Sequence, residues 1–324
     1  MTYEKLGQSD LMVSPLCVGC MSFGDPASKM HDWTLNPAQT EEIVKTALAL
    51  GINFFDTANS YSAGTSEEYL GQALKHNVQR DKVVIATKVY FNPGHLSREA
   101  ILREAEGSLR RLGTDYIDLY IIHRYDFDTP IEETMAALHS LVQAGKVRAL
   151  GASAMYGYQF HNLQQTAIEN GWTPFSSMQN HYNLLYREDE RELIPVCRQY
   201  GTALTPYSPL AAGRLSRTDW HSGSHRSETD RVAVSKYDGT RAQDAQIVDR
   251  VHALAETHQV TMTQIALAWQ YAKGVVSPIV GATKAAHLVD AAKGSRLALS
   301  QEDCAFLEAP YLPHRVMGAL TPNA

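Results

Sequence analysis

The sequence predicts an α/β protein that folds as a (β/α)8 TIM barrel, with an N-terminal β-hairpin closing the barrel floor. Short apolar segments of strand character alternate with amphipathic helical segments along the chain, as in parallel α/β folds. Polar side chains follow the ends of several predicted strands, which is where active sites lie in such barrels. The length of 324 residues and the 44% hydrophobic content suffice for one large core, so we expect a single domain over residues 1–324.

Eight segments provide the predicted strands, and most of them are rich in β-branched or aromatic residues. The strands are residues 17–20, 52–55, 82–88, 116–122, 147–151, 177–180, 202–207 and 275–280. Ahead of them, residues 3–6 and 11–13 flank the turn-forming segment 7–10 and form the expected hairpin.

The helices between the strands have recognisable ends. One begins at Asn36-Pro37 and stops at Gly51, and another begins near Ser97 and stops before Gly113. A third begins with Thr129-Pro130-Ile131-Glu132, which predicts a capping box with Pro at the first helical position. Apolar residues three and four apart give each helix one core-facing stripe.

Residues 208–244 interrupt this alternation because they are polar and show no clear periodicity. A long segment of this kind after the seventh strand predicts a lid at the catalytic mouth. Within it, His221 and His225 lie four residues apart, but no third ligand accompanies them, so we expect surface histidines and not a metal pair. Cys17 and Cys20 likewise lack a second pair of cysteines, and we expect no metal site and no disulfide scaffold.

The charge pattern limits the partners of the chain. A net charge of -6 and a pI near 6.1 provide no basic face for nucleic acid. The first residues lack the features of a signal peptide, and no segment approaches the roughly 20 apolar residues of a membrane span. We expect a cytoplasmic protein that binds a small molecule and has no nucleic-acid or membrane partner, whereas its oligomeric state is not encoded in any pattern.

Four polar residues, Asp56, Tyr61, Lys88 and His123, fall at or just beyond the ends of three predicted strands. A neighbouring ammonium favours a phenolate, so Lys88 would lower the pKa of Tyr61. Asp56 would in turn keep a buried Lys88 charged. His123 adds a donor that could orient a carbonyl oxygen. Taken singly, each residue also has a structural interpretation: a turn cap, a surface aromatic, a solvated strand end and a core histidine, respectively.

At these residues the chain resembles the aldo-keto reductase family, and the resemblance covers nearly its whole length. The segments that carry it are residues 51–61 (GINFFDTANSY), 84–88 (VIATK), 108–118 (SLRRLGTDYID) and 121–123 (IIH). The resemblance implies hydride transfer from NADPH to an aldehyde or ketone without a metal. Tyr61 would be the general acid, Lys88 and Asp56 would tune it, and His123 would orient the carbonyl.

Further positions resemble the family's cofactor groove. The resemblance implies that Ser153 and Gln179 hold the carboxamide, that Tyr207 stacks on the nicotinamide and that residues 208–215 cover the pyrophosphate. Residues 281–284, at the start of a helix, resemble the site for the 2'-phosphate, which suits backbone donors and a lysine. The implied cofactor residues are Gly19, Cys20, Met21, Asp56, Ser153, Gln179, Tyr207, Ser208, Pro209, Leu210, Gly213, Arg214, Gly281, Thr283, Lys284 and His287.

Three positions depart from the common family pattern: Ala154, His287 and Ala291. Many members have asparagine at position 154, and alanine there is similar to the branch that includes potassium-channel β subunits, so the chain resembles a bacterial member close to that branch. The other two departures make Lys284 the main residue favouring NADPH over NADH.

A mixed aromatic and basic set predicts the substrate pocket: Trp33, Tyr90, Arg124, Tyr125 and Tyr182. This set suits small aromatic or sugar-derived aldehydes. Arg124 either holds an anionic group of the substrate or pairs with Asp126 or another carboxylate.

Two other functions fit the same barrel. A sugar-phosphate isomerase or lyase would use Lys88 as a nucleophile and the last βα turn for phosphate. A cofactor-sensing subunit would bind NADPH with little turnover, as the channel-associated branch implies.

Overall fold

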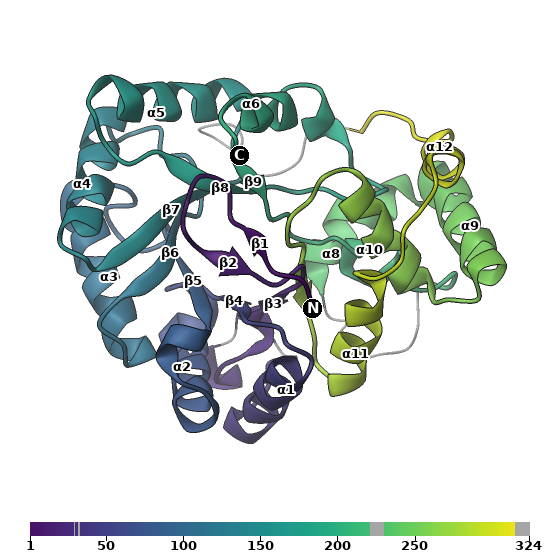
Figure 1. The fold of residues 1–324 in the computed structure, drawn as a ribbon, viewed down its shortest axis with the longest axis horizontal. Helices are drawn as coiled ribbons and strands as arrows, with labels where there is room; N and C mark the ends of the chain where they lie inside the picture. The colour runs from purple at the N-terminus through teal and green to yellow at the C-terminus, as the bar shows by residue number, and fades with distance from the viewer. Residues whose placement is uncertain (29, 32, 221–229, 315–324) are drawn as a thin grey trace.

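The computed structural model describes residues 1–28, 30–31, 33–220 and 230–314. Eight parallel strands form a curled sheet inside a ring of helices (Figure 1). The strands, in the order in which they lie side by side, are β10 (Ile279–Gly281), β3 (Cys17–Gly19), β4 (Phe54–Asp56), β5 (Val84–Val89), β6 (Ile117–Ile122), β7 (Val147–Ser153), β8 (Phe175–Gln179) and β9 (Ala203–Leu204). The predicted barrel and all eight predicted strands are confirmed.

The sheet closes between β9 and β10 through irregular backbone hydrogen bonds. The amide of Val276 donates to the Leu204 carbonyl at 3.1 Å, and the amide of Ile279 donates to the Pro206 carbonyl at 2.9 Å. Both predicted strands are longer than the observed ones. Pro206 and Pro278 explain this difference, because proline has no amide to donate to a ladder.

The predicted hairpin is confirmed and closes the floor of the barrel. It consists of β1 (Glu4–Lys5) and β2 (Met12–Val13), which pair in antiparallel fashion and lie across the end of the barrel that faces the viewer in Figure 1. The side chains of Leu6, Leu11 and Val13 are buried and pack with inward-facing residues of the strands. The hairpin thus fills one end of the barrel.

The helices cover the outside of the sheet, and two large apolar clusters lie between helices and strands. The helices in the described residues are α1 (Pro37–Ala49), α2 (Thr65–Asn77), α3 (Arg98–Leu112), α4 (Ile131–Gln143), α5 (Gly157–Glu169), α6 (Leu193–Gln199), α8 (Arg231–Tyr237), α9 (Arg241–His258), α10 (Met262–Ala272), α11 (Ala285–Gly294) and α12 (Gln301–Glu308). The predicted caps of α1 and α3 are confirmed, because the side chains of Asn36 and Ser97 accept backbone hydrogen bonds.

The predicted capping box at the start of α4 is wrong. Pro130 is the N-cap residue, not the first helical residue, and no side chain caps the helix. The hydroxyl of Thr129 donates instead to the carboxylate of Asp126 at 2.7 Å. The Thr129 hydroxyl is therefore used by a carboxylate three residues earlier in the chain and not by the helix.

The segment 208–244 contains regular structure that its sequence did not predict. The seven-residue helix α8 is capped by Asp230, whose carboxylate accepts from the Ala233 amide at 3.0 Å, and α9 begins within the segment. A helix of seven residues has too few turns for its apolar residues to show the helical periodicity. His221 and His225 lie outside the described residues, and the lid function stays a prediction.

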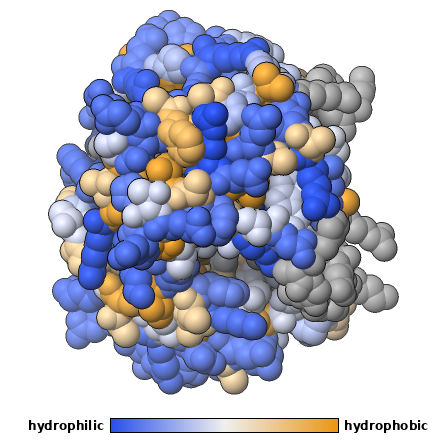
Figure 2. All heavy atoms as spheres, turned by 90° about the vertical axis from the view of Figure 1, so that its right-hand side faces the viewer, coloured by the Kyte–Doolittle hydropathy of each residue, from blue (hydrophilic) through white to orange (hydrophobic). Residues whose placement is uncertain are grey.

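The face that carries α9 and α12 is mostly hydrophilic, with apolar residues scattered among polar ones (Figure 2). Across the part of the chain that the structure describes, every helix is too short or too polar to cross a membrane.

Candidate active site

Parallel pairing brings three of the four predicted catalytic residues to one rim of the barrel. Asp56 ends β4 and lies in register with Ala86 of β5, so that Lys88 projects from β5 two residues further along. Lys88 in turn pairs with Ile121 of β6, and His123 follows that strand directly. Asp56, Lys88 and His123 therefore lie on or directly after three neighbouring strands, in the same order as in the sequence.

Lys88 and Asp56 form a buried ion pair. The Nζ of Lys88 is 2.5 Å from Oδ1 of Asp56, and the exposed fractions of the two residues are 0% and 3%. The same Nζ donates to the Thr57 carbonyl at 2.7 Å and to the hydroxyl of Tyr61 at 3.2 Å. Gln179 donates its Nε2 to the other oxygen of Asp56 at 2.9 Å. The ammonium therefore has three acceptors, one of which is the Tyr61 hydroxyl.

The environment keeps Lys88 protonated, as predicted. Burial acts to lower the pKa of Lys88, but the charge of Asp56 and the hydrogen bonds to Asp56 and Tyr61 outweigh it and raise the pKa above its ordinary value. Burial raises the pKa of Asp56, and the charge of Lys88 opposes that effect. A lysine held in this way is a poor nucleophile because its lone pair carries the proton.

Tyr61 departs from its predicted electrostatics. It begins a short 3-10 turn, η3 (Tyr61–Gly64), in which Ser62 and Ala63 have left-handed backbone angles. Burial raises the pKa of Tyr61, and this effect exceeds the lowering caused by the Lys88 charge. The net shift is upward, whereas the sequence predicted a lowered value. Tyr61 is therefore a protonated phenol at neutral pH, which is the form that a proton donor requires.

His123 is a neutral histidine beside Tyr61. Its ring centroid lies 5.8 Å from that of Tyr61, with the planes at 77°. Burial, followed by the charges of Lys88 and Arg124, lowers the pKa of His123 well below its ordinary value. Its Nδ1 is buried without a hydrogen-bond partner. A neutral imidazole with free hydrogen-bonding capacity is available to an oxygen atom of a ligand.

The predicted carboxamide residues lie at the adjoining strand ends. Ser153 ends β7 in register with Gln179, which ends β8, and the Ser153 hydroxyl donates to the Gln179 carbonyl at 2.8 Å. Gln179 also touches Asp56, as described above. On the other side, Gly19 ends β3 in register with Asp56, and Cys20 and Met21 follow it in a 3-10 turn. These residues thus surround the buried ion pair.

Tyr207 follows β9 and stacks on His181. The two ring centroids are 5.2 Å apart and the planes differ by 6°, and His181 stacks in turn on Tyr186 at 4.3 Å. This places one aromatic surface at the rim, next to the strand that carries Gln179.

The loop after Tyr207 makes a compact turn. Ser208, Ala211 and Ala212 adopt left-handed backbone angles. The loop contains the remaining residues predicted there: Pro209, Leu210, Gly213 and Arg214. The guanidinium of Arg214 bonds to the carboxylate of Asp238, so that this arginine fixes the loop to the segment beyond α8.

The predicted 2'-phosphate residues lie around the start of α11. Gly281 ends β10, Lys284 is the exposed N-cap residue, and Thr283 precedes it. His287 is exposed on the first turn. The helix N-terminus and Lys284 give this position donors and positive charge.

Four of the five predicted substrate residues have loop positions. Trp33 stacks on His31. In the same loop, the Met30 sulfur accepts a hydrogen bond from the Ser62 amide. Tyr90 and Arg124 lie just beyond the β5 and β6 ends, and Tyr125 packs edge-on against Phe127.

The fifth, Tyr182, is a core residue, so its assignment to the pocket is wrong. It is 1% exposed, its ring packs on Trp269 at 5.1 Å, and its hydroxyl donates to Glu190 at 2.5 Å. Adjacent residues in an extended segment point in opposite directions, and it is the neighbouring His181 that faces Tyr207.

The structure adds residues that the sequence reasoning missed. Phe91 packs edge-on against the His123 ring at 4.9 Å. Lys236 of α8 places its Nζ 4.8 Å from the centroid of the Tyr207 ring. The Tyr237 hydroxyl lies 2.7 Å from Nε2 of His181. The alternation of side chains along 179–182 could have indicated His181. The segment 208–244 was predicted at the mouth, but no sequence signal showed that it forms α8 or that Lys236 reaches the Tyr207 ring.

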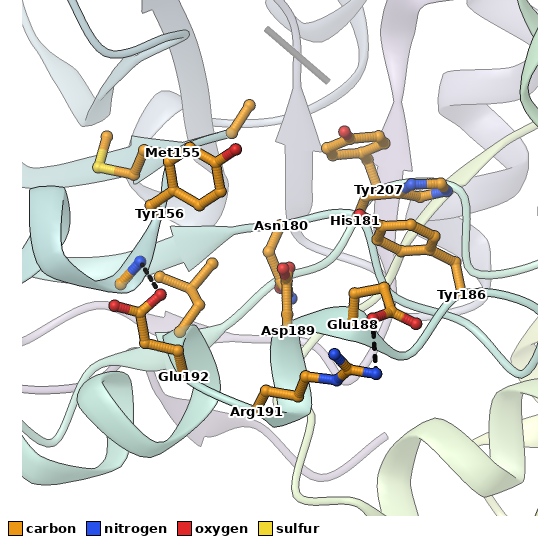
Figure 3. A pocket seen from close by; sticks show the side chains of 13 residues that line it. Met155, Tyr156, Asn180, His181, Tyr186, Glu188, Asp189, Arg191, Glu192 and Tyr207 are labelled. Carbon is orange, nitrogen blue, oxygen red and sulfur yellow. Dashed lines mark hydrogen bonds and ion pairs between the residues drawn. The ribbon is translucent and has the colours of Figure 1, made fainter. Parts of the chain in front are cut away.

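A cavity of about 160 Å³ opens beside Tyr207 (Figure 3). It lies between the segment 154–157 and the loop 186–193, with Asn180 and Asp189 at its centre. Burial raises the pKa of Asp189 to about 7. None of the four predicted catalytic residues lines this cavity, which lies beside Tyr207.

Comparisons with known proteins agree with this geometry. The sequence matches the Aldo/keto reductase family over residues 15–311. It is 43% identical to an aldo-keto reductase of Alternaria alternata, covering 95% of this chain and 91% of that protein. It is 40% identical to versiconal hemiacetal acetate reductase of Aspergillus parasiticus, covering 98% of each.

Among solved structures, the fold matches a thermostable aldo-keto reductase crystallised with the inhibitor epalrestat. The TM-score is 0.76 and the identity is 30%, covering 96% of this chain and all of that one. The two relatives named above are fungal, so the predicted placement among bacterial members near channel β subunits is not confirmed. The family prediction itself is confirmed: the chain belongs to the aldo/keto reductase family of oxidoreductases.

Proposed function

We propose that the protein is a single-domain reductase that converts aldehydes or ketones to alcohols with NADPH, and that Tyr61 is its general acid. The observation that carries this proposal is the contact of the Tyr61 hydroxyl with a buried, charged Lys88, which Asp56 holds in place. The names of the similar proteins, which are reductases, support the reaction class.

The residues at the rim suit a nicotinamide cofactor. Tyr207 offers an aromatic surface backed by His181, Gln179 and Ser153 offer polar groups beside it, and Lys284 lies at a helix N-terminus that suits phosphate. When bound, NADPH would supply the hydride. The preference for NADPH over NADH would then depend mainly on Lys284, as the resemblance implies.

The proton would come from Tyr61. Its raised pKa keeps the phenol protonated at neutral pH, and the Lys88 ammonium stabilises the phenolate that remains after the proton has moved to the carbonyl oxygen. Neutral His123 would donate a hydrogen bond to the same oxygen and orient it. Asp56 and Gln179 would fix the position of Lys88 and take no part in the transfer.

The two other functions are less well supported. An isomerase or lyase with Lys88 as nucleophile requires an unprotonated amine, whereas the ion pair with Asp56 raises the pKa of Lys88. A sensing subunit with little turnover would not need a proton donor at hydrogen-bond distance from a charged lysine.

The test is the Tyr61→Phe variant, which removes the hydroxyl and keeps the ring that packs beside His123. We expect a loss of at least about 100-fold in kcat for aldehyde reduction, since general acid catalysis contributes roughly 10²–10⁴-fold. The Kd for NADPH, measured by fluorescence titration, should change little. Full activity of the variant would refute the role of Tyr61. Absence of turnover in the wild type with short-chain, aromatic and sugar-derived aldehydes, despite NADPH binding, would favour the sensing function.

A further inference from the structure

The guanidinium of Arg124 lies next to the catalytic histidine without a counter-ion among the described residues. Its Nε and Nη1 are buried and have no hydrogen-bond partner. Its Cζ is 5.6 Å from the centroid of Phe91, the ring that packs on His123. Buried donors of a cation are costly when they are left unpaired. This position therefore suits an anionic ligand, because the described part of the chain supplies no partner for these two nitrogens.

The carboxylate that the sequence offered as a partner for Arg124 is engaged elsewhere. Asp126 accepts hydrogen bonds from the Leu96 amide at 3.0 Å, from the Asp128 amide at 3.0 Å and from the Thr129 hydroxyl at 2.7 Å. Asp126 thus fixes the loop that carries Arg124, and its carboxylate forms no ion pair with the Arg124 guanidinium.

Lys236 provides a second cation at the same mouth. Its Nζ lies over the Tyr207 ring, and no ion pair joins it to a carboxylate within the described ranges. Burial, followed by the charge of Arg124, lowers the pKa of Lys236 to about 8, so most molecules still carry the ammonium at neutral pH. The charge of Arg124 also lowers the pKa values of His123 and Tyr207, which is consistent with its position over the Phe91 ring that packs on His123.

We propose that Arg124 and Lys236 together bind an anionic group, a carboxylate or a phosphate, of the carbonyl substrate whose oxygen lies at Tyr61 and His123. Guanidinium and ammonium groups form strong charge-assisted hydrogen bonds with such oxygens. The ring of Phe91, which lies beside both Arg124 and His123, suits a flat body between the anion and the carbonyl group. The inference rests on the proposed reductase function.

The kinetic test compares 4-carboxybenzaldehyde with its neutral analogue, methyl 4-formylbenzoate, and with 4-formylphenyl phosphate. For the wild type, kcat/KM should be higher with the anionic aldehydes than with the ester. In Arg124→Gln this preference should fall roughly 10- to 100-fold, the value of a hydrogen-bonded charge pair, and in Lys236→Gln it should fall by a smaller factor. The control is Arg98→Gln, which removes the same charge from an exposed position at the start of α3 and should keep the preference.

A binding measurement separates this inference from the proposed function. Calorimetry with benzoate should show at least 10-fold weaker binding to Arg124→Gln than to the wild type, whether or not any aldehyde is reduced. If no aldehyde is reduced but benzoate binding depends on Arg124, the reductase proposal fails and the anion site stands. An unchanged preference and unchanged benzoate binding in Arg124→Gln would overturn the anion site. A 10-fold rise in the Kd for NADPH in that variant would also overturn it, because the cations would then serve the cofactor.

Discussion

Replacing Lys88 with methionine tests the electrostatic arrangement most directly. The change keeps an unbranched side chain but removes the ammonium, which leaves the buried Asp56 carboxylate with Gln179 as its remaining side-chain donor. The lowering effect of Lys88 on the pKa of Asp56 is then lost, and burial, which raises that pKa, is left largely unopposed.

The expected cost follows from the burial of the pair. Breaking a buried ion pair by removing one partner costs about 3–5 kcal/mol. Unfolding entropy of about 2.1 cal/mol/K per residue over 324 residues gives a fall in Tm of roughly 1.5 °C for each kcal/mol. Lys88→Met should therefore melt roughly 4–7 °C below the wild type at pH 7.

The matched control is the double variant Asp56→Asn/Lys88→Met, in which no unpaired charge remains. It should recover at least half of the lost Tm, because a neutral amide can still accept the hydrogen bond from Gln179. The assay is a melt followed by circular dichroism at pH 7 for the wild type and for the two variants. Equal melting temperatures of single and double variant would refute the idea that an uncompensated Asp56 charge causes the loss.

Two further predictions concern the rim. Lys284→Ala should raise the Kd for NADPH by about 10-fold and leave the Kd for NADH nearly unchanged, since only NADPH carries the 2'-phosphate. The control is Lys293→Ala, at the other end of α11. An unchanged ratio of the two dissociation constants in Lys284→Ala would refute the assignment of Lys284. The pKa of Asp189 is raised to about 7 from an ordinary value of 3.8, so the folded protein holds that proton more tightly and stability falls as the pH rises from about 4 to 7. Asp189→Asn removes this pH-dependent contribution to stability. Between pH 5 and pH 8 the free energy of unfolding of the variant should therefore fall by roughly 3 kcal/mol less than that of the wild type, which corresponds to roughly 4 °C in Tm. Parallel curves of Tm against pH for the two proteins would contradict this expectation.

Local pattern was enough to predict the barrel, its eight strands and the rim position of the residues proposed for catalysis. Parallel strands end at the same rim, so a polar residue at each strand end, such as Asp56, Lys88 or His123, has its place fixed once the strands are recognised. Cap residues such as Asn36 carry the same kind of local information, because their partners lie three residues away.

Predictions that depended on which of several possible partners a side chain takes in the folded protein were less reliable. Thr129 hydrogen-bonds to Asp126 in preference to capping α4, and Tyr182 turns into the core while His181 faces the rim. The sequence left Arg124 with two alternatives, and the structure separates it from Asp126, whose oxygens are already taken.

The sequence by itself determined which side chains meet at the rim, because local apolar and polar patterns predict the order of the strands and where each strand ends. Only the tertiary structure decided their charge states and the surface around them. Tyr61 has a raised pKa because the burial produced by many residues far apart in the sequence exceeds the effect of one known neighbour, Lys88. Lys236 reaches Tyr207 because α8 folds over the mouth. Desolvation and charge are sums over everything that surrounds a group, and that surrounding exists only after the chain has folded.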